Sequence, residues 1–424
     1  MYNIEAIGMI YFTVTFQGKE DDEMSKHIYA DHAATTRLSD KALAAMMPYL
    51  TECYGNPSSL YRLGGESQKA VDAARMTMQE CLNAPRPNDI YFVSGGSEAD
   101  NWAIRGAAEI GAKKGKKHII STEFEHHAVL HTLDYLKKQG FEITLLPVHE
   151  NGIVRPDELE AAIREDTALV TVMFANNEIG TIQPIKELCA VAHKHKVLFH
   201  TDAVQAVGTL PIDVQELDVD LLSLSSHKFH GPKGVGALYI RKGLNLPNLI
   251  YGGAQERGKR AGTENTAGIV GMATALKEAV GSIPQRTERL TRMRDRLIDG
   301  LLKIDRSRVN GDRLHRLPGN VNMCFEGIEG ESLLLMLDLK GVSASSGSAC
   351  TSGSLDPSHV LLALGLPHEI AHGSLRLTFG DDNTEEDIDY ILSVVPPIIE
   401  RLRSMSPLWE KIVMQDRHDN QKEG

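Results

Sequence analysis

The sequence has few cysteines, no long apolar run and no excess of positive charge. Its five cysteines, Cys53, Cys81, Cys189, Cys324 and Cys350, are odd in number, and none is in CxxC spacing. This pattern indicates neither a disulfide framework nor a structural zinc site, and it favours the reducing cytoplasm. The first four cysteines lie in apolar or helix-like contexts, which are typical of core or half-buried thiols.

Two further absences exclude classes of partner. No apolar run approaches the roughly 18–20 residues that a membrane-spanning helix needs. The formal net charge is −12 and no basic run is present, which argues against a nucleic-acid partner and against an anionic membrane surface. The 424 residues, 42% hydrophobic and 24% charged, are those of a globular protein with two or three domains.

The chain divides into segments of different character. Residues 1–23 have no signal-peptide features, and we expect them to form an extension outside the fold. Residues 40–282 alternate apolar strand candidates with helical patterns, which predicts a large α/β domain with a mostly parallel, seven-stranded sheet. Residues 283–409 predict a smaller α+β domain, with residues 24–39 packed against it and 410–424 as a polar tail.

The strand candidates of the larger domain are continuous apolar runs, as expected for strands that are covered on both faces. They are Ile90–Val93, His118–Ser121, Glu142–Leu146, Ala168–Met173, Val197–His200, Leu221–Leu224 and Gly236–Ile240. Helices are expected between them, for example at residues 156–163 and 185–195. In the smaller domain we expect helices at 285–302, 330–340 and 384–405, and strands at 319–325 and 374–379.

Polar motifs follow several of these strands, at the sheet edge where ligands bind in open α/β folds. Gly96 and Ser97 follow the strand at 90–93 and open a helix, whose free N–H groups attract a phosphate. His126 follows the strand at 118–121, and Asn177 follows the strand at 168–173. Each motif alone fits a structural role equally well, as a helix cap, a loop histidine or a turn.

Asp202 and Lys228 complete this series of motifs. Asp202 follows the strand Val197–His200, and Lys228 follows the next strand, Leu221–Leu224. A lysine at a sheet edge suits an imine with an aldehyde cofactor, and an acid on the adjacent strand suits the protonated ring nitrogen of pyridoxal phosphate (PLP). Lys228 alone would be read as a surface lysine. A phosphate loop, a histidine, an acid and a lysine in this order favour a PLP site.

Longer motifs resemble one family of enzymes. Asp31–Thr36, Gly55–Ser59, Ser225–Gly234, Arg260–Asn265 and Ser345–Ser354 are similar to the motifs of NifS/IscS-type cysteine desulfurases, and the likeness spans about residues 27–409. The continuation Leu355–Val360 resembles NifS most closely. The resemblance implies a fold-type-I PLP enzyme of the class-V aminotransferase family that works as a homodimer and converts L-cysteine to L-alanine.

The resemblance also implies a role for each motif. Lys228 would hold PLP, Asp202 would pair with the ring nitrogen, and His126 would stack on the ring and move protons. Gln205 would bond the phenolic oxygen, and Asn177 would lie beside the cofactor and the substrate carboxylate.

The remaining implied roles concern anions. Arg376 would bind the substrate α-carboxylate as a planar fork. The phosphate ligands would be Gly96, Ser97, Ser225 and His227, with Thr263 contributed by the second copy of the chain.

Cys350 lies in a Ser/Gly-rich loop at about residues 343–358, which suits a nucleophile that must move. The resemblance implies that sulfur passes to Cys350 as a persulfide and then to an iron–sulfur scaffold or another acceptor. Cys350 would at most be a transient iron–sulfur ligand, and no structural metal site is expected. Two alternatives stay open: a selenocysteine lyase or related PLP lyase, and a non-catalytic sulfur carrier or scaffold-binding protein.

Overall fold

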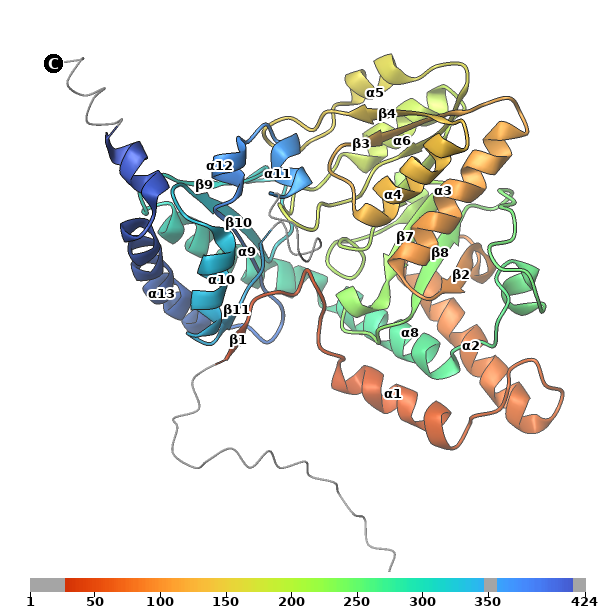
Figure 1. Ribbon diagram of the computed structural model, residues 1–424. Helices are drawn as coiled ribbons and strands as arrows, with labels where there is room; N and C mark the ends of the chain where they lie inside the picture. Colours follow the sequence, from red (N-terminus) through yellow and green to blue (C-terminus); the bar gives the residue numbers. More distant parts are fainter. Residues whose placement is uncertain (1–26, 347–356, 415–424) are drawn as a thin grey trace, which may run out of the picture.

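A seven-stranded sheet forms the centre of the larger of two units, in the order β2-β8-β7-β6-β5-β3-β4 (Figure 1). The computed structural model describes residues 27–346 and 357–414, so the expected extension 1–23 and Cys350 lie outside the described residues. The strands are β2 Ile90–Val93, β3 His118–Thr122, β4 Glu142–Leu146, β5 Thr167–Thr171, β6 Leu198–Asp202, β7 Leu221–Ser225 and β8 Gly236–Ile240. Only β8 runs antiparallel to its neighbours in this sheet. The predicted fold class, a mostly parallel sheet of seven strands, is confirmed.

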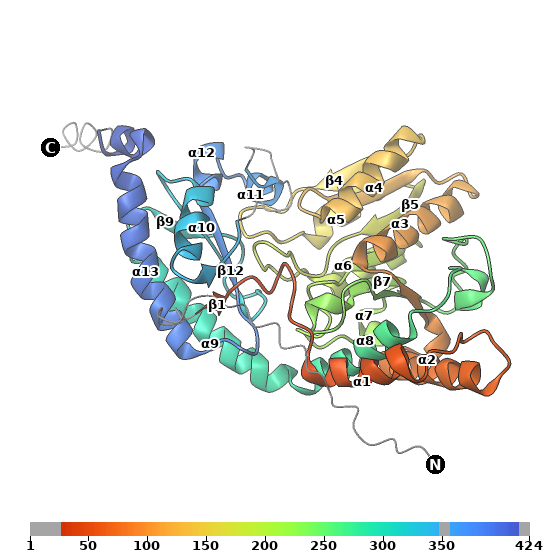
Figure 2. The same ribbon diagram turned by 60° about the horizontal axis from the view of Figure 1, so that its bottom comes forward.

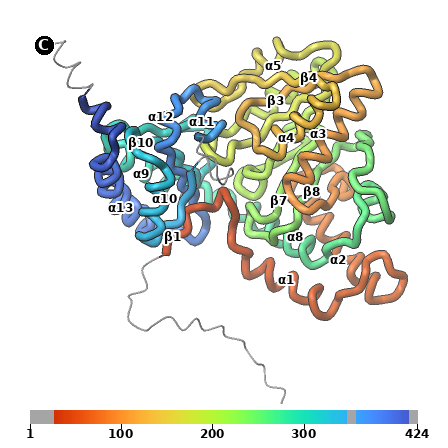
Figure 3. The backbone as a smooth tube through the Cα atoms, viewed as in Figure 1, coloured from red at the N-terminus to blue at the C-terminus, as the bar shows by residue number. Residues whose placement is uncertain are grey.

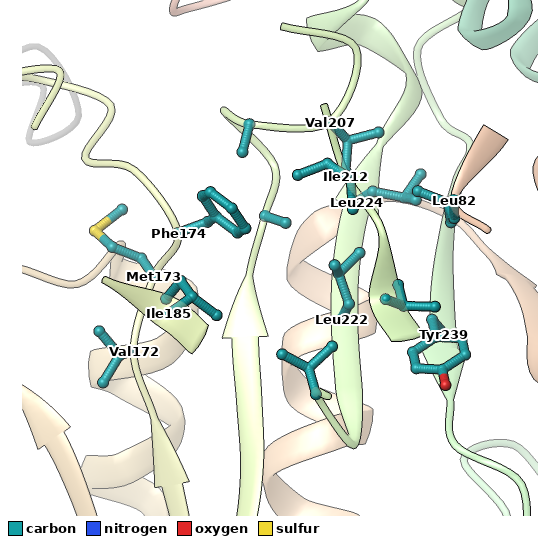
Figure 4. Packing of buried hydrophobic residues seen from close by; sticks show 14 of the residues in the cluster. Leu82, Val172, Met173, Phe174, Ile185, Val207, Ile212, Leu222, Leu224 and Tyr239 are labelled. Carbon is teal, nitrogen blue, oxygen red and sulfur yellow. The ribbon is translucent and has the colours of Figure 1, made fainter. Parts of the chain in front are cut away.

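Helices cover both faces of this sheet because its strands are apolar on both sides. Leu221 of β7 packs with Trp102 and Leu169 on one face. Its neighbours Leu222 and Leu224 point to the opposite face and join the core that Figure 4 shows. The alternation follows from the two-residue period of a strand, which sends successive side chains to opposite faces.

The helices of the larger unit form two layers. α3 and α4 lie over one face, whereas α1, α2, α6 and α8 contribute to the core of the other. Their bounds, with those of the remaining short helices up to residue 281, are α1 Asp40–Thr51, α2 Arg62–Cys81, η1 Pro87–Asp89, α3 Gly96–Ala112, α4 His127–Lys138, α5 Pro156–Ala162, α6 Ile185–Lys194, α7 Val214–Leu217, η2 Ser226–Lys228, η3 Gln255–Gly258 and α8 Thr266–Gly281.

The smaller unit has its own core around an antiparallel sheet of order β12-β10-β9. A short parallel pair, β1 with β11, joins the start of the described chain to this unit. Its elements, in chain order, are β1 Ile28–Tyr29, α9 Ile283–Leu301, β9 Ser307–Val309, β10 Asn320–Phe325, α10 Gly330–Asp338, β11 Val342–Ser343, β12 Ser374–Thr378 and α13 Glu385–Ser404. Two short helices, α11 His359–Ala363 and α12 His368–Ala371, instead pack into the core of the larger unit.

Two segments connect the units. The red segment between β1 and α1 crosses from the smaller to the larger unit, and α9 leads from the end of α8 back into the smaller one (Figures 2 and 3). The crossing segment is held by Thr36, whose N–H and hydroxyl both donate to the carbonyl O of His227 at 2.9 Å. The strand end that carries Lys228 is therefore tied directly to the segment that links the two units.

The predicted elements match the structure to within a few residues at their ends. The two- and three-residue strands β1, β9 and β11 were not predicted, because so few residues carry no periodic pattern. In the part of the chain that the structure describes, no helix combines the length and apolarity that crossing a bilayer requires.

Candidate active site

The polar motifs converge at the carboxyl ends of the parallel strands, on the side that faces the smaller unit (Figure 1). Asp202 is the last residue of β6 and Ser225 the last residue of β7. His227 and Lys228 lie in η2, the single 3-10 turn that follows β7. His126 caps α4 after the end of β3. This convergence follows from the parallel topology, which brings the ends of successive strands to one edge.

The amine of Lys228 is half-buried and faces the crossing segment. Its Nζ donates to the carbonyl O of Ala33 at 2.5 Å and to that of Ala34 at 2.8 Å. Gln205 donates its Nε2 to the same Ala33 oxygen at 2.9 Å. The side chains of Lys228 and Gln205 therefore meet at one backbone acceptor.

His126 is held in its neutral form. Its Nδ1 accepts a hydrogen bond from the N–H of Ala128 at 3.1 Å, which leaves the proton on Nε2. Burial, and to a lesser extent the charge of Lys228, lower the pKa of His126 to about 4. A neutral imidazole beside Lys228 can lie against an aromatic ring and donate one N–H.

Asp202 is buried, with 5% of its surface exposed. Burial raises its pKa to about 6, and the hydrogen bond from the N–H of Val204 and the charge of Lys228 limit that rise. The carboxyl of Asp202 is consequently ionised near pH 7, which is the state that pairs with a protonated ring nitrogen.

Sequence reasoning missed a layer of buried polar groups behind Asp202. His200 has ring nitrogens 2.8 Å from Thr171 Oγ1 and 2.9 Å from Ser223 Oγ, and burial lowers its pKa to about 3. Asp100 on α3 places Oδ1 3.7 Å from His200 Nε2, and burial together with the Asp202 charge raises the pKa of Asp100 well above its usual range.

Glu125 belongs to the same layer and is fully buried. Its Oε1 accepts from Thr122 Oγ1 at 2.7 Å and from the N–H of Met173 at 2.9 Å. Burial, with a smaller effect from the charge of Asp202, raises the pKa of Glu125 to about 8, although the two hydrogen bonds limit that rise. Asp202 is therefore the ionised member of this group of buried acids at neutral pH. For Glu125, the signal available in the sequence was an acidic residue shortly after the apolar strand β3.

The phosphate side of the site is built on glycine. A Cβ added to Gly96 would lie 2.7 Å from Val204 Cγ2. The start of α3 can therefore pack against the loop after β6 only because residue 96 is a glycine and has no side chain. Ser225 is buried beside it, and Ser97 is exposed in the first turn of α3. The N-terminus of a helix 17 residues long supplies free N–H groups for an anion there.

His227 and Thr263 are the other two residues expected to bind the phosphate. His227 places Nδ1 3.1 Å from Thr35 Oγ1, and burial with the charges of Lys228 and Lys233 lowers its pKa to about 4. Thr263 is exposed and lines a pocket together with Ser94. Within one chain, Thr263 is thus left at the surface.

Arg376 comes from β12 of the smaller unit and is buried. Its Nη1 donates to the carbonyl O of Asn177 at 3.2 Å, and its Nη2 donates to Asp31 Oδ1 at 2.8 Å. Its Nε is buried with no hydrogen-bond partner among the described residues. The Arg376 guanidinium therefore lies beside the backbone of Asn177, and its Nε–H is a buried donor without a partner among the described residues.

The cysteines and potential metal ligands of the described residues add no second centre. Cys189 and Cys324 are buried, and Cys53 and Cys81 are half-buried, in line with the prediction from their sequence contexts. In the described ranges, no cluster of three or more His, Cys, Asp or Glu side chains has a geometry that could hold a metal ion.

An α/β fold with a lysine and an acid at adjacent strand ends is the architecture of fold-type-I PLP enzymes. Residues 28–391 match the family described as Aminotransferase class-V, and the chain belongs to that family. The predicted NifS/IscS-type resemblance is confirmed by the relatives that follow.

The chain is 56% identical over 390 residues to "Cysteine desulfurase IscS" of Clostridium botulinum strain Hall, covering 91% of this chain and 98% of the relative. Among solved structures, it is similar to one described as "NIFS-LIKE PROTEIN", with a TM-score of 0.84, 38% identity, and coverage of 89% of this chain and 100% of the other. It is also similar to "SspA in complex with cysteine", with a TM-score of 0.74, 35% identity, and coverage of 83% and 98%.

Proposed function

We propose that this protein is a PLP-dependent cysteine desulfurase that converts L-cysteine to L-alanine. The observation that carries the proposal is the convergence of Lys228, Asp202 and His126 at one sheet edge, opposite the buried fork of Arg376. The 56% identity to a cysteine desulfurase and the likeness to a structure described with bound cysteine support the same substrate.

The residues present fit PLP in charge and in shape. The ionised Asp202 suits the ring nitrogen, the neutral His126 suits a ring face, and Gly96 lets the backbone approach a phosphate. Lys228 would hold the cofactor, and Gln205 would donate to its phenolic oxygen. When bound, PLP supplies an electron sink for the pair released at the substrate Cα.

The chain's own groups would orient the substrate and move its protons. Arg376 would bind the α-carboxylate through Nε and the adjacent Nη, with Asn177 beside it. Lys228, once its amine is released from the cofactor, would take the Cα proton. His126 would donate from Nε2, the nitrogen that carries its proton.

The sulfur step places Cys350 as the nucleophile. Its thiolate would attack the substrate sulfur, so that a C–S bond breaks and an S–S bond forms. The thiol proton is balanced by the proton that Cβ gains, and no external oxidant is needed because carbon is reduced as sulfur is oxidised. Burial raises the pKa of the Cys81 and Cys324 thiols to about 11, which makes them poor alternatives at neutral pH.

The remaining elements of the proposal concern assembly. We place the enzyme in the cytoplasm as a homodimer in which the exposed Thr263 of one copy completes the phosphate site of the other. Ser97, Ser225 and His227 would be its phosphate partners. Sulfur would leave Cys350 for an iron–sulfur scaffold or another acceptor protein. Residues 40–282 would form the cofactor domain and 283–409 the smaller domain.

The test is made on purified protein. Wild type should be yellow and should release sulfide from L-cysteine in the presence of a reductant. Lys228→Ala should lose the visible absorption band and the activity, because no other amine can bond the aldehyde in this position. Lys233→Ala, at an exposed site five positions along the chain, should keep both. A wild-type protein that stays colourless after incubation with PLP would exclude this function.

A further inference from the structure

The first turn of α3 carries an acid at the place where the phosphate of the cofactor is expected. Glu98 is the third residue of this helix, two positions after Gly96. Its Oε2 accepts from the N–H of Ser94 at 3.0 Å and also from the Ser94 hydroxyl. An ionised carboxylate and a phosphate are both attracted to a helix N-terminus, but they repel each other. Unless it is balanced, the charge of Glu98 therefore weakens the binding of an anion beside it.

The turn that holds Glu98 packs against the end of β7. A Cβ added to Gly95 would lie 3.7 Å from Ser225 Oγ, and one added to Gly96 would lie 3.6 Å from Ser225 Cβ. Ser225 is the last residue of β7 and one of the expected phosphate ligands. The acid is thus within one helical turn of the residues that would bind the phosphate.

Arg260 supplies the balancing charge. Its Nε donates to Glu98 Oε1 at 2.8 Å and its Nη2 donates to Glu98 Oε2 at 3.3 Å, although 162 positions separate the two residues. The two side chains are 23% and 18% exposed, so water and salt screen this pair less than an ion pair on the surface. Burial alone would raise the pKa of Glu98, but the hydrogen bonds from Arg260 and Ser94 hold it below its usual range. Glu98 is consequently ionised at neutral pH, and its charge is met by a planar fork.

A second ion pair neutralises another acid near Arg260. Glu256 is buried and accepts from Arg75 Nη1 at 2.8 Å and from Arg75 Nη2 at 2.6 Å, and its Oε2 also accepts from the N–H of Phe92 at 3.0 Å. The hydrogen bond to Glu98 raises the pKa of Arg260, and the charge of Glu256 adds a smaller effect in the same direction. Arg75 thus balances Glu256, while Arg260 is bound to Glu98. The same contacts tie η3, the turn that precedes Arg260, to β2.

We infer that Arg260 is a positioning residue for the cofactor phosphate: it neutralises Glu98 and so lets the first turn of α3 accept a second negative group. The inference rests on the proposed function, in which this turn binds the phosphate of PLP. The role is electrostatic, because Arg260 acts through Glu98. A variant that loses both charges should therefore bind the cofactor better than a variant that loses only the positive charge.

The test is a titration of the full-length protein, freed of cofactor, with PLP, followed by the visible absorption band. Arg260→Gln should raise the apparent Kd for PLP by about tenfold to a hundredfold, because an unbalanced charge near a phosphate in a half-buried site has an effect of that size. Arg260→Lys keeps the positive charge and should stay close to wild type. Glu98→Gln alone should bind PLP at least as tightly as wild type.

The double variant, Arg260→Gln with Glu98→Gln, separates this role from a structural one. If charge is responsible, removing the carboxylate should restore most of the PLP affinity that Arg260→Gln loses. If the pair only holds the fold together, Glu98→Gln alone would weaken PLP binding and the double variant would be no better than Arg260→Gln, which would overturn the inference. Glu109→Gln removes an exposed carboxylate near the other end of α3 and is the matched control. Combined with Arg260→Gln, it should restore nothing.

Pyridoxal, which has no phosphate, gives a second readout. Its apparent Kd should be the same for wild type and Arg260→Gln, because the repulsion acts on the phosphate. An equal loss of affinity for pyridoxal and for PLP would contradict the inference. If wild type binds no PLP, the proposed function fails. If wild type binds PLP and Arg260→Gln binds it equally well, only the role of Arg260 fails.

Discussion

Arg376 and Asp31 form an ion pair between β12 of the smaller unit and the segment that crosses to the larger one. Arg376 Nη2 lies 2.8 Å from Asp31 Oδ1, and the two side chains are 5% and 20% exposed. Since Nη1 also donates to Asn177, the guanidinium is held at both terminal nitrogens, and its Nε stays without a partner among the described residues. The pair therefore orients the planar group before any substrate arrives.

The first prediction concerns that fork. Arg376→Lys keeps the positive charge but loses the planar pair of donors, so the KM for L-cysteine should rise about tenfold or more. The visible absorption of the bound cofactor should not change, because the proposed role of Arg376 is to bind the substrate and not the cofactor. Steady-state kinetics and absorption spectra measure both. Arg292→Lys, at an exposed ion pair on α9, is the control. An unchanged KM would remove Arg376 from the substrate site.

The second prediction concerns the nucleophile. Cys350→Ser should bind the cofactor and show the same visible spectrum, yet lose sulfide release from cysteine by roughly a thousandfold or more, as removal of an essential nucleophile does. Cys53→Ser, at a half-buried thiol, should keep wild-type turnover. A Cys350→Ser variant with wild-type turnover would refute the persulfide step.

The same position separates the two enzyme classes. Selenium leaves carbon without attack by a thiolate, so Cys350→Ala should retain activity on selenocysteine while losing it on cysteine. A wild-type enzyme that strongly prefers selenocysteine, and whose rate is insensitive to Cys350→Ala, would instead indicate a selenocysteine lyase.

The third prediction concerns pH and the buried acid Glu125. Its pKa is raised to about 8 in the folded protein, so the folded state holds a proton that the unfolded chain releases at lower pH. The stability that this proton provides is complete below about pH 4 and is lost as pH rises through 8. Glu125→Gln mimics the protonated acid, and its amide oxygen can still accept from Thr122 and Met173.

The predicted fall in stability with rising pH is tested by measuring the free energy of unfolding by chemical denaturation at pH 5 and pH 8. Between these pH values the wild type should lose about 3–4 kcal/mol more than Glu125→Gln, since stability falls by up to about 1.4 kcal/mol for each pH unit between the unfolded and folded pKa of Glu125. Glu123→Gln, at an exposed site on the same loop, is the control and should follow the wild type. Parallel curves for wild type and Glu125→Gln would mean that Glu125 is ionised in the folded state.

The sheet and much of the candidate site could be predicted because the signals are local. Leu221–Leu224 is apolar throughout and is followed at once by His227 and Lys228, so one stretch of sequence predicts both a buried strand and a polar edge. In the same way, the apolar run Val197–His200 predicts the preceding strand and places Asp202 at its end. Their proximity then needs only the rule that parallel strands end at a common edge.

Glu178, Asp100 and His200 could not be recognised in this way. Glu178 reads as part of a turn, and only the fold shows that Ser358 reaches its carboxyl. Asp100 reads as a polar residue near a helix start, and only the packing of α3 on the sheet places it beside His200 and buries it. Burial and partner identity are properties of the folded chain, and they set the pKa of each acid.

The sequence by itself determined the periodic strands and helices and the family, and it named the candidates for the reacting groups, because each depends on residues that are near neighbours in the chain. Only the tertiary structure decided which buried acid is favoured in its ionised form, which nitrogen of Arg376 is buried without a partner, and which residues bind Glu178 and Arg376. These depend on desolvation and on hydrogen bonds between segments more than a hundred positions apart, such as Glu178 with Ser358 and Asp31 with Arg376.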